Sequence, residues 1–174
     1  IANINSAIIK GLTPDTEYDY VIGPEAAFSD KAAFKTDAEG RTDTEFFVIG
    51  DIQNPDKTNL EAIVDKLNAT GKTYNFGIQT GDAIDQGTDF DDWNSVGQIL
   101  GAKKLADTNL ISIMGNHEYY GDPDTVVASA MYNNSNTAEG AYYSVEYGNV
   151  YIATVNFATT GAQIKKAAEW LVED

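Results

Sequence analysis

The sequence predicts an α/β fold in which a mostly parallel sheet follows a short antiparallel β segment. From Glu45 onward, apolar runs of strand length alternate with segments that carry apolar residues at helical spacing. Before residue 38 the chain shows short alternating stretches broken by Gly and Pro, which is typical of antiparallel strands. A polar, turn-forming linker, residues 38–44, separates the two parts.

The composition is that of a folded, acidic chain. Of 174 residues, 43% are hydrophobic and 22% charged, which is sufficient for a packed core. The formal net charge of -16 argues against partners such as a nucleic-acid backbone or an anionic membrane surface. No apolar run is long enough to span a membrane. The absence of cysteine excludes thiolate metal sites, and fits an exported bacterial protein as well as a cytosolic one.

Residues 1–37 predict two short strands. A Gly-Leu-Thr-Pro turn leads into Tyr18-Asp19-Tyr20-Val21, with one aromatic face, and "AAFKT" follows as a second strand. The spacing from Leu12 to Tyr18 is that of a tyrosine corner, and the stretch resembles the closing strands of a fibronectin type III-like domain. Because such a sandwich needs about 100 residues, we expect only its C-terminal strands here. A generic β-hairpin is the alternative.

Strands and helices alternate through residues 45–174. The strands are "EFFVIGD", "YNFGIQTGD" and "NLISIMGNHE", and between them lie the helices "NPDKTNLEAIVDKLNATG" and "DFDDWNSVGQILGAKKLAD". The first helix carries Leu60, Ile63, Val64 and Leu67 on one face and ends at Gly71. The acidic start of the second is expected to be solvated. This β-α-β-α-β order implies a mostly parallel sheet covered by helices.

Two further elements are expected near the C-terminus. "GAYYSVEYGNVYIATVNF" predicts a β-hairpin with its turn at Tyr147-Gly148-Asn149. Residues 161–174 predict an amphipathic helix. Its buried face is expected to carry Ile164, Ala168, Leu171 and Val172.

Each of the three expected parallel strands ends on a polar cluster that begins with glycine. These clusters start at Gly50-Asp51, Gly81-Asp82 and Gly115-Asn116. Because ligands bind at the carboxyl ends of parallel strands, we expect Asp51, Asp82 and Asn116 to share one edge. Two carboxylates and an amide oxygen suit a hard or borderline cation. The alternatives are that the aspartates cap the following helices and that His117, the single histidine, is structural.

The three motifs in this order resemble the calcineurin-like metallophosphoesterase family, and within it the purple acid phosphatase-like subgroup. That signature reads Asp-x-(His or Gly), Gly-Asp-x-x-(Asp or Tyr) and Gly-Asn-His-(Asp or Glu). The resemblance covers about residues 7–174. It implies the N-terminal half of an αββα sandwich, preceded by the last strands of a β-sandwich domain.

The resemblance also implies a role for each motif residue. Asp51 would bind the first metal ion, Asp82 would bridge both, and Asn116 would bind the second. His117 would act on the scissile phosphate, and Asp85 would orient its imidazole. Glu118 is expected to be a helper or surface group and not a ligand. The implied reaction is hydrolysis of a phosphomonoester or phosphodiester by a metal-bound hydroxide, with two Fe, Mn or Zn ions.

Two positions depart from the family pattern. Gln53 stands where His or Gly is usual, and its amide oxygen would bind the first metal more weakly than imidazole. Asp85 replaces the metal-binding tyrosine of the purple enzymes, so no tyrosinate-iron colour is expected.

The family's remaining ligands are histidines, and this chain has none after His117. We therefore expect an excerpt of a longer extracellular or cell-surface protein from a bacterium, inactive by itself, that holds a single Mg²⁺ or Ca²⁺ or no ion. The alternative is a non-catalytic surface or interaction protein that retains the metallophosphoesterase fold.

Overall fold

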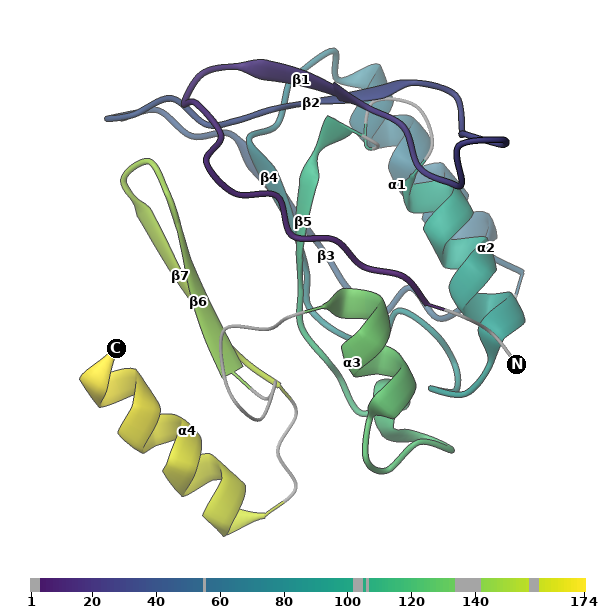
Figure 1. The fold of residues 1–174 in the computed structure, drawn as a ribbon. Helices are drawn as coiled ribbons and strands as arrows, with labels where there is room; N and C mark the ends of the chain where they lie inside the picture. The colour runs from purple at the N-terminus through teal and green to yellow at the C-terminus, as the bar shows by residue number, and fades with distance from the viewer. Residues whose placement is uncertain (1–3, 55, 102–104, 106, 134–141, 157–159) are drawn as a thin grey trace.

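A computed structural model describes residues 4–54, 56–101, 105, 107–133, 142–156 and 160–174. Its principal helices and strands are shown in Figure 1. The strands are β1 Glu17–Tyr20, β2 Ala32–Lys35, β3 Phe46–Ile49, β4 Phe76–Gln79, β5 Asn109–Ser112, β6 Tyr142–Tyr147 and β7 Val150–Val155. The helices are α1 Thr58–Ala69, α2 Phe90–Leu100, α3 Val126–Tyr132 and α4 Gly161–Glu173, with a 3-10 turn, η2, at His117–Tyr119.

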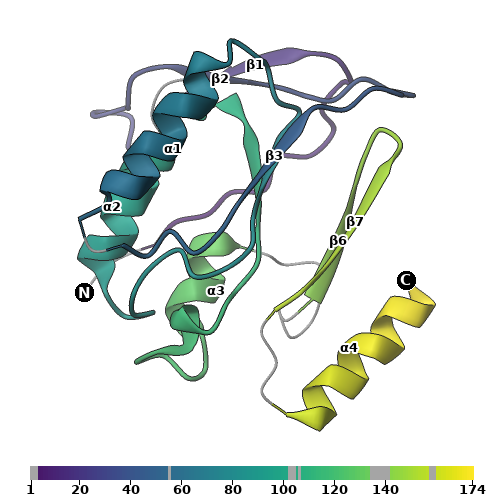
Figure 2. The same ribbon diagram turned by 180° about the vertical axis from the view of Figure 1, so that it is seen from behind.

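The larger part of the chain is layered as helix, sheet, sheet, helix. The strands β3, β4 and β5 form a parallel sheet in that order, and β6 and β7 pair as an antiparallel hairpin. Helices α1 and α2 cover one side of the parallel sheet, the hairpin lies on the other side, and α4 lies beyond the hairpin (Figures 1 and 2). The predicted α/β class with αββα layers is confirmed. Within the described ranges, no helix has the length and apolarity needed to cross a bilayer.

The main core lies between the parallel sheet and the two helices that cover it. Leu60 and Val64 of α1 are buried there, as predicted from their helical spacing. Trp93 and Val96 of α2 and Ile49 of β3 belong to the same cluster. Burial of each such large side chain contributes about 1.5–3 kcal/mol, so this cluster holds the helices against the sheet.

A second, smaller core joins the parallel sheet to the hairpin. Phe76 of β4 and Ile111 of β5 pack with Tyr143 of β6. The Tyr143 hydroxyl donates a hydrogen bond of 2.8 Å to the Ser112 carbonyl, and burial raises the pKa of Tyr143 to about 12. The hairpin therefore contacts β5 at the point where that strand ends.

The N-terminal strands β1 and β2 are antiparallel, as predicted. The rings of Tyr18 and Phe34 stack with centroids 5.7 Å apart, which places aromatic side chains on one face. The Thr13 N–H donates to the Tyr18 hydroxyl at 2.8 Å, which is the hydrogen bond expected of a tyrosine corner. Assignment of these strands to a fibronectin type III-like domain remains a prediction.

Helix α4 turns a different face to the hairpin from the one predicted. Ala167 is buried, and the Trp170 ring stacks on Tyr142 of β6 with centroids 4.9 Å apart. Ile164 and Leu171 of the predicted apolar face are 58% and 50% exposed, and Val172 is 88% exposed. An indole ring buries a large apolar area when it stacks on another ring, and this contact accounts for the rotation of the helix.

Two short elements after β5 were not predicted. The turn η2 follows Asn116 directly, and α3 lies in a stretch whose Asp-Pro-Asp sequence is typical of a loop. The Asp122 carboxylate accepts the Val127 N–H at 2.7 Å and so satisfies an amide in the first turn of α3. This helix carries Tyr132 back toward the ends of β4 and β5.

Candidate functional site

The three polar clusters lie at one edge of the parallel sheet. Ile49, Gln79 and Ser112 are in register at the last pairs of β3, β4 and β5, so the residues that follow them emerge at the same edge. The Asp51 N–H donates to the Gly81 carbonyl at 3.2 Å. The prediction that Asp51, Asp82 and Asn116 follow adjacent parallel strands is confirmed.

Glycine at the start of each cluster permits a close approach of the loop backbones. A Cβ on Gly115 would overlap Asp82 Oδ1 and would lie 2.7 Å from the Asp82 nitrogen. A Cβ on Gly81, whose φ is +102°, would lie 2.5 Å from the Gly115 nitrogen. A Cβ on Gly50 would overlap Thr80 Oγ1. The loops could not pack in this way with larger residues.

Both aspartates sit in the left-handed backbone region, with φ of 51° for Asp51 and 55° for Asp82. Asp tolerates this region better than most residues, but the conformation still stores strain, which is common at functional sites. Neither residue caps a helix, since the cap of α1 is Lys57 and that of α2 is Asp89. The helix-capping alternative is therefore wrong for these two carboxylates.

The side chains at this edge present oxygen atoms suited to a cation. Asp82 Oδ1 accepts the His117 N–H at 3.0 Å. The Asn116 amide nitrogen donates to the Tyr120 hydroxyl at 2.8 Å, which leaves the amide oxygen Oδ1 available to a ligand. The Gln53 oxygen Oε1 is buried and has no hydrogen-bond partner among the described residues. A buried, unpaired oxygen is costly, and a bound cation would satisfy it.

This donor set fits a hard divalent ion. Carboxylate and amide oxygens are the ligands that Mg²⁺, Ca²⁺ and Mn²⁺ accept, often with several waters. In the part of the chain that the structure describes, no group of three His, Cys, Asp or Glu side chains could hold a metal ion. The oxygens of Asp51, Asp82, Asn116 and Gln53 are the candidate ligands at this edge.

The Glu118 carboxylate joins the second and third clusters. It is fully buried and accepts three backbone N–H groups, from Asp82 at 3.0 Å, Ala83 at 2.8 Å and Gly115 at 2.7 Å. The expectation of a surface group was therefore wrong, and that of a helper remains a prediction. The only feature of the sequence that pointed to Glu118 was its position directly after His117 in the third motif.

A buried polar network lies behind Glu118. The Tyr132 hydroxyl of α3 lies 3.1 Å from Glu118 Oε1 and 3.3 Å from Gln79 Oε1, and these two acceptors share its single hydrogen. The Gln79 amide nitrogen donates to the Gly81 carbonyl at 2.8 Å. Burial is the main cause that raises the pKa of Tyr132, and the negative charge of Glu118 is the second. The hydroxyl therefore stays protonated and can donate at neutral pH. Sequence reasoning missed this network because it depends on the unpredicted helix α3.

His117 is held by Asp85, though not by the group expected. Imidazole Nδ1 lies 2.9 Å from the Asp85 backbone carbonyl oxygen and 3.5 Å from the carboxylate oxygen Oδ1. Because a carbonyl only accepts, this contact selects the tautomer that carries hydrogen on Nδ1. The Asp85 side chain is 56% exposed, so the flexible carboxylate is a poorer anchor than the backbone. The Tyr120 ring lies against the imidazole, with centroids 4.7 Å apart.

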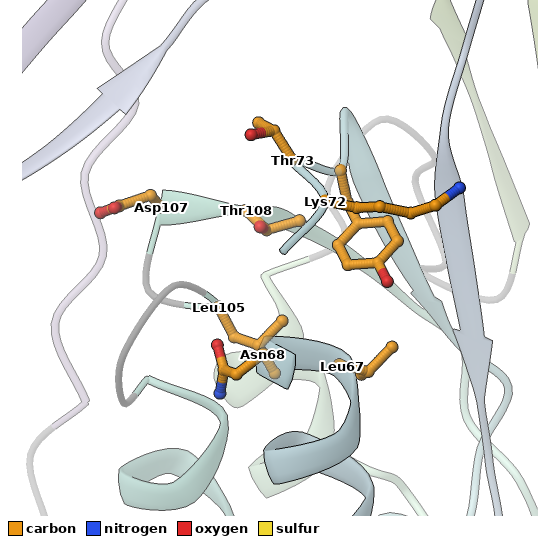
Figure 3. A pocket seen from close by; sticks show the side chains of 8 residues that line it. Leu67, Asn68, Lys72, Thr73, Leu105, Asp107 and Thr108 are labelled. Carbon is orange, nitrogen blue, oxygen red and sulfur yellow. The ribbon is translucent and has the colours of Figure 1, made fainter. Parts of the chain in front are cut away.

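A pocket elsewhere in the protein contains none of these residues. Figure 3 shows its lining, which includes Leu67 and Asn68 from the end of α1, Leu105, and residues 72–74 and 107–108 just before β4 and β5. It therefore lies at the amino ends of these strands, away from the polar clusters. The candidate site is an open edge and not this pocket.

Comparison with known proteins agrees with the fold. The calcineurin-like phosphoesterase family matches residues 44–171, most of the chain. No curated protein matches significantly. Among solved structures, the purple acid phosphatase PPD1 from yellow lupin (Lupinus luteus) seeds is similar, with a TM-score of 0.68 and 17% sequence identity. The alignment covers 94% of this chain and 34% of that phosphatase, so the chain spans about a third of its length. The chain belongs to the calcineurin-like phosphoesterase family.

Proposed function

We propose that the protein containing this chain is a metal-dependent hydrolase of phosphate esters, either monoesters or diesters. The observation that carries this proposal is the shared edge formed by Asp51, Asp82, Asn116 and His117 beyond three adjacent parallel strands. Family membership supports the same reaction class. An extracellular or cell-surface location is part of the proposal.

The residues at this edge divide into metal ligands and a group that acts on the substrate. Asp51, Asp82 and the amide oxygens of Asn116 and Gln53 would hold the metal ions that the reaction needs. Bound ions would polarise phosphoryl oxygens and supply an activated water at neutral pH. Their charge would also let a phosphate ester approach a chain with a net charge of -16.

His117 would serve the leaving group. With Nδ1–H donated to the Asp85 carbonyl, Nε2 is the ring atom left for the substrate. In the protonated imidazole, Nε2–H can donate to the leaving oxygen and transfer its proton as the ester bond breaks. The neighbouring Tyr120 ring restricts the rotation of the imidazole.

The test combines binding and turnover. Mn²⁺ binding to this chain, followed by electron paramagnetic resonance, should be measurable and should disappear in Asp82→Asn. In the full-length protein, hydrolysis of p-nitrophenyl phosphate and bis(p-nitrophenyl) phosphate should require added metal. Asp82→Asn should remove metal and activity together, whereas His117→Ala should lower kcat with metal affinity retained. Metal-independent hydrolysis, or full turnover by both variants, contradicts the proposal.

A non-catalytic interaction protein is the second candidate. It is favoured by Gln53 in place of a stronger ligand and by the lack, among described residues, of three metal-binding side chains in one group. This candidate predicts that the full-length protein binds no divalent ion at millimolar concentration and hydrolyses neither ester.

A further inference from the structure

Lys57 and Asp92 form a buried ion pair next to the candidate site. Their side chains are 8% and 11% exposed, although the acidic start of α2 was expected to be solvated. Lys57 lies between the first cluster and α1, and Asp92 lies in the first turn of α2. Burial of two charges costs desolvation, and apolar residues of similar size often give equal stability. Stability alone therefore does not explain why an ion pair occupies this position.

The Asp92 carboxylate makes a second contact that leads toward His117. Its Oδ1 pairs with Lys57 Nζ, and its Oδ2 accepts the Asp85 N–H at 2.9 Å. The carbonyl of the same residue, Asp85, contacts His117 Nδ1 at 2.9 Å. Lys57, Asp92, the Asp85 backbone and the imidazole thus form one continuous series of polar contacts.

We infer that Asp92, held in place by Lys57, is a positioning residue for His117. Asp92 fixes the Asp85 backbone, and the Asp85 carbonyl then fixes both the orientation of the imidazole and its Nδ1–H tautomer. The Asp85 carboxylate is half exposed and lies farther from imidazole Nδ1, at 3.5 Å, than the carbonyl does. Any catalytic consequence rests on the proposed function, but the effect on the imidazole does not.

The chain offers a direct probe, because His117 is its only histidine. The ¹⁵N shifts of one imidazole in the metal-free chain report the tautomer ratio without assignment. The spectra are recorded at a pH where the ring is neutral. Free imidazole side chains in water favour the Nε2–H tautomer. An excess of the Nδ1–H tautomer therefore measures how strongly the hydrogen bond to the Asp85 carbonyl stabilises it.

Three variants separate positioning from folding. Asp92→Ala removes the acceptor for the Asp85 N–H. The double variant Lys57→Met/Asp92→Leu removes it as well, but replaces the ion pair with apolar side chains and should keep the fold. Asp91→Asn changes an exposed neighbour on the same turn of α2 and is the matched control. Near-ultraviolet circular dichroism establishes that each variant is folded.

The wild type and Asp91→Asn should show an Nδ1–H excess. Asp92→Ala and the double variant should move the ratio toward Nε2–H by about fivefold, the factor that a hydrogen bond of ordinary strength gives. An unchanged ratio in the folded double variant overturns the inference, even if Asp92→Ala does not fold. In the full-length protein, the double variant should lower kcat with metal affinity unchanged. If the ratio shifts but kcat does not, positioning stands and the catalytic role proposed for His117 fails.

Discussion

Glu118 accepts the backbone N–H of Ala83 at 2.8 Å, so a side chain from the loop after β5 is fixed to the loop after β4. The same carboxylate accepts N–H groups from Asp82 and Gly115. One buried group thereby determines how far Asp82 lies from Asn116. The position of two candidate ligands depends on a residue that is not itself a ligand.

Glu118→Ala should strongly destabilise the protein. It leaves three backbone N–H groups without an acceptor, that of Ala83 buried and those of Asp82 and Gly115 partly buried. Each unsatisfied buried group costs about 1–3 kcal/mol. Urea unfolding should show a loss of at least about 2 kcal/mol in the free energy of unfolding. Glu61→Ala, which changes an exposed carboxylate on α1, should stay within about 0.5 kcal/mol of wild type. Equal effects of the two substitutions would contradict the role assigned to Glu118.

Tyr120→Phe should weaken metal binding while the fold is retained. The hydroxyl accepts from Asn116 Nδ2 and so keeps Oδ1 turned to the ligand position, whereas the ring contact with His117 survives in Phe. Loss of such a supporting hydrogen bond lowers metal affinity by about tenfold or more. Isothermal titration with Mn²⁺ measures the change. Tyr20→Phe on β1 is the control and should bind like wild type.

Gln53→Met should have opposite effects on the metal-free and metal-bound protein. Methionine removes a buried amide oxygen that has no partner among the described residues, so the metal-free form should gain about 1 kcal/mol of stability. The stabilisation given by added Mg²⁺ or Mn²⁺ should shrink, because a ligand is lost. Thermal unfolding with and without metal measures both. Destabilisation of the metal-free form would indicate that Gln53 is structural.

The stability of the protein should fall as the pH rises above about 10, the ordinary pKa of tyrosine. Burial raises the folded-state pKa of Tyr132, and raises that of Tyr143 to about 12. A raised folded pKa gives stability that is complete below the unfolded pKa and is lost as the pH rises through the folded value. Urea midpoints between pH 9 and 11.5 measure this slope.

The variant Tyr132→Phe tests whether Tyr132 causes part of the loss of stability above pH 10. In this variant the urea midpoint should fall less steeply above pH 10. The remaining fall should come from Tyr143. The substitution should also cost about 1 kcal/mol at pH 7, because Glu118 loses a donor. An unchanged slope would show that Tyr132 does not carry the effect.

The two faces of α4 should respond differently to substitution. Trp170→Ala should cost about 3 kcal/mol or more, since the ring stacks on Tyr142. Val172→Glu should stay within about 0.5 kcal/mol of wild type, since the side chain is 88% exposed. Val172→Glu should also reduce the binding of an apolar dye by the native protein. Urea unfolding and dye fluorescence provide the measurements.

The sequence predicts that Asp51, Asp82 and Asn116 share one edge of the sheet, because the features that place them there lie in short segments of the chain. Apolar runs give the strands, the intervening helices require parallel connections, and parallel strands place their carboxyl ends together. The tyrosine corner at Tyr18 was predicted for the same reason, since its hydrogen bond with Thr13 spans only five residues of chain.

The parts that were not predicted depend on contacts between distant segments. Glu118 is bonded to the loop after β4 and to Tyr132 of α3, and Asp92 pairs with Lys57. The rotation of α4 was predicted wrongly because its apolar stripe is broad, and the stack of Trp170 on Tyr142 decides between faces. Chain periodicity does not contain this information.

The carboxylate of Glu118 gives the loop amides of Asp82, Ala83 and Gly115 the protection that is usual for strands. Their deuterium exchange should therefore need opening of the sheet, and should be as slow as in β4 and β5. A ligand that reaches this edge meets backbone that is already ordered. It then loses little affinity to the entropy of loop ordering, so association can be fast and the site can bind a weakly held ion without first having to assemble.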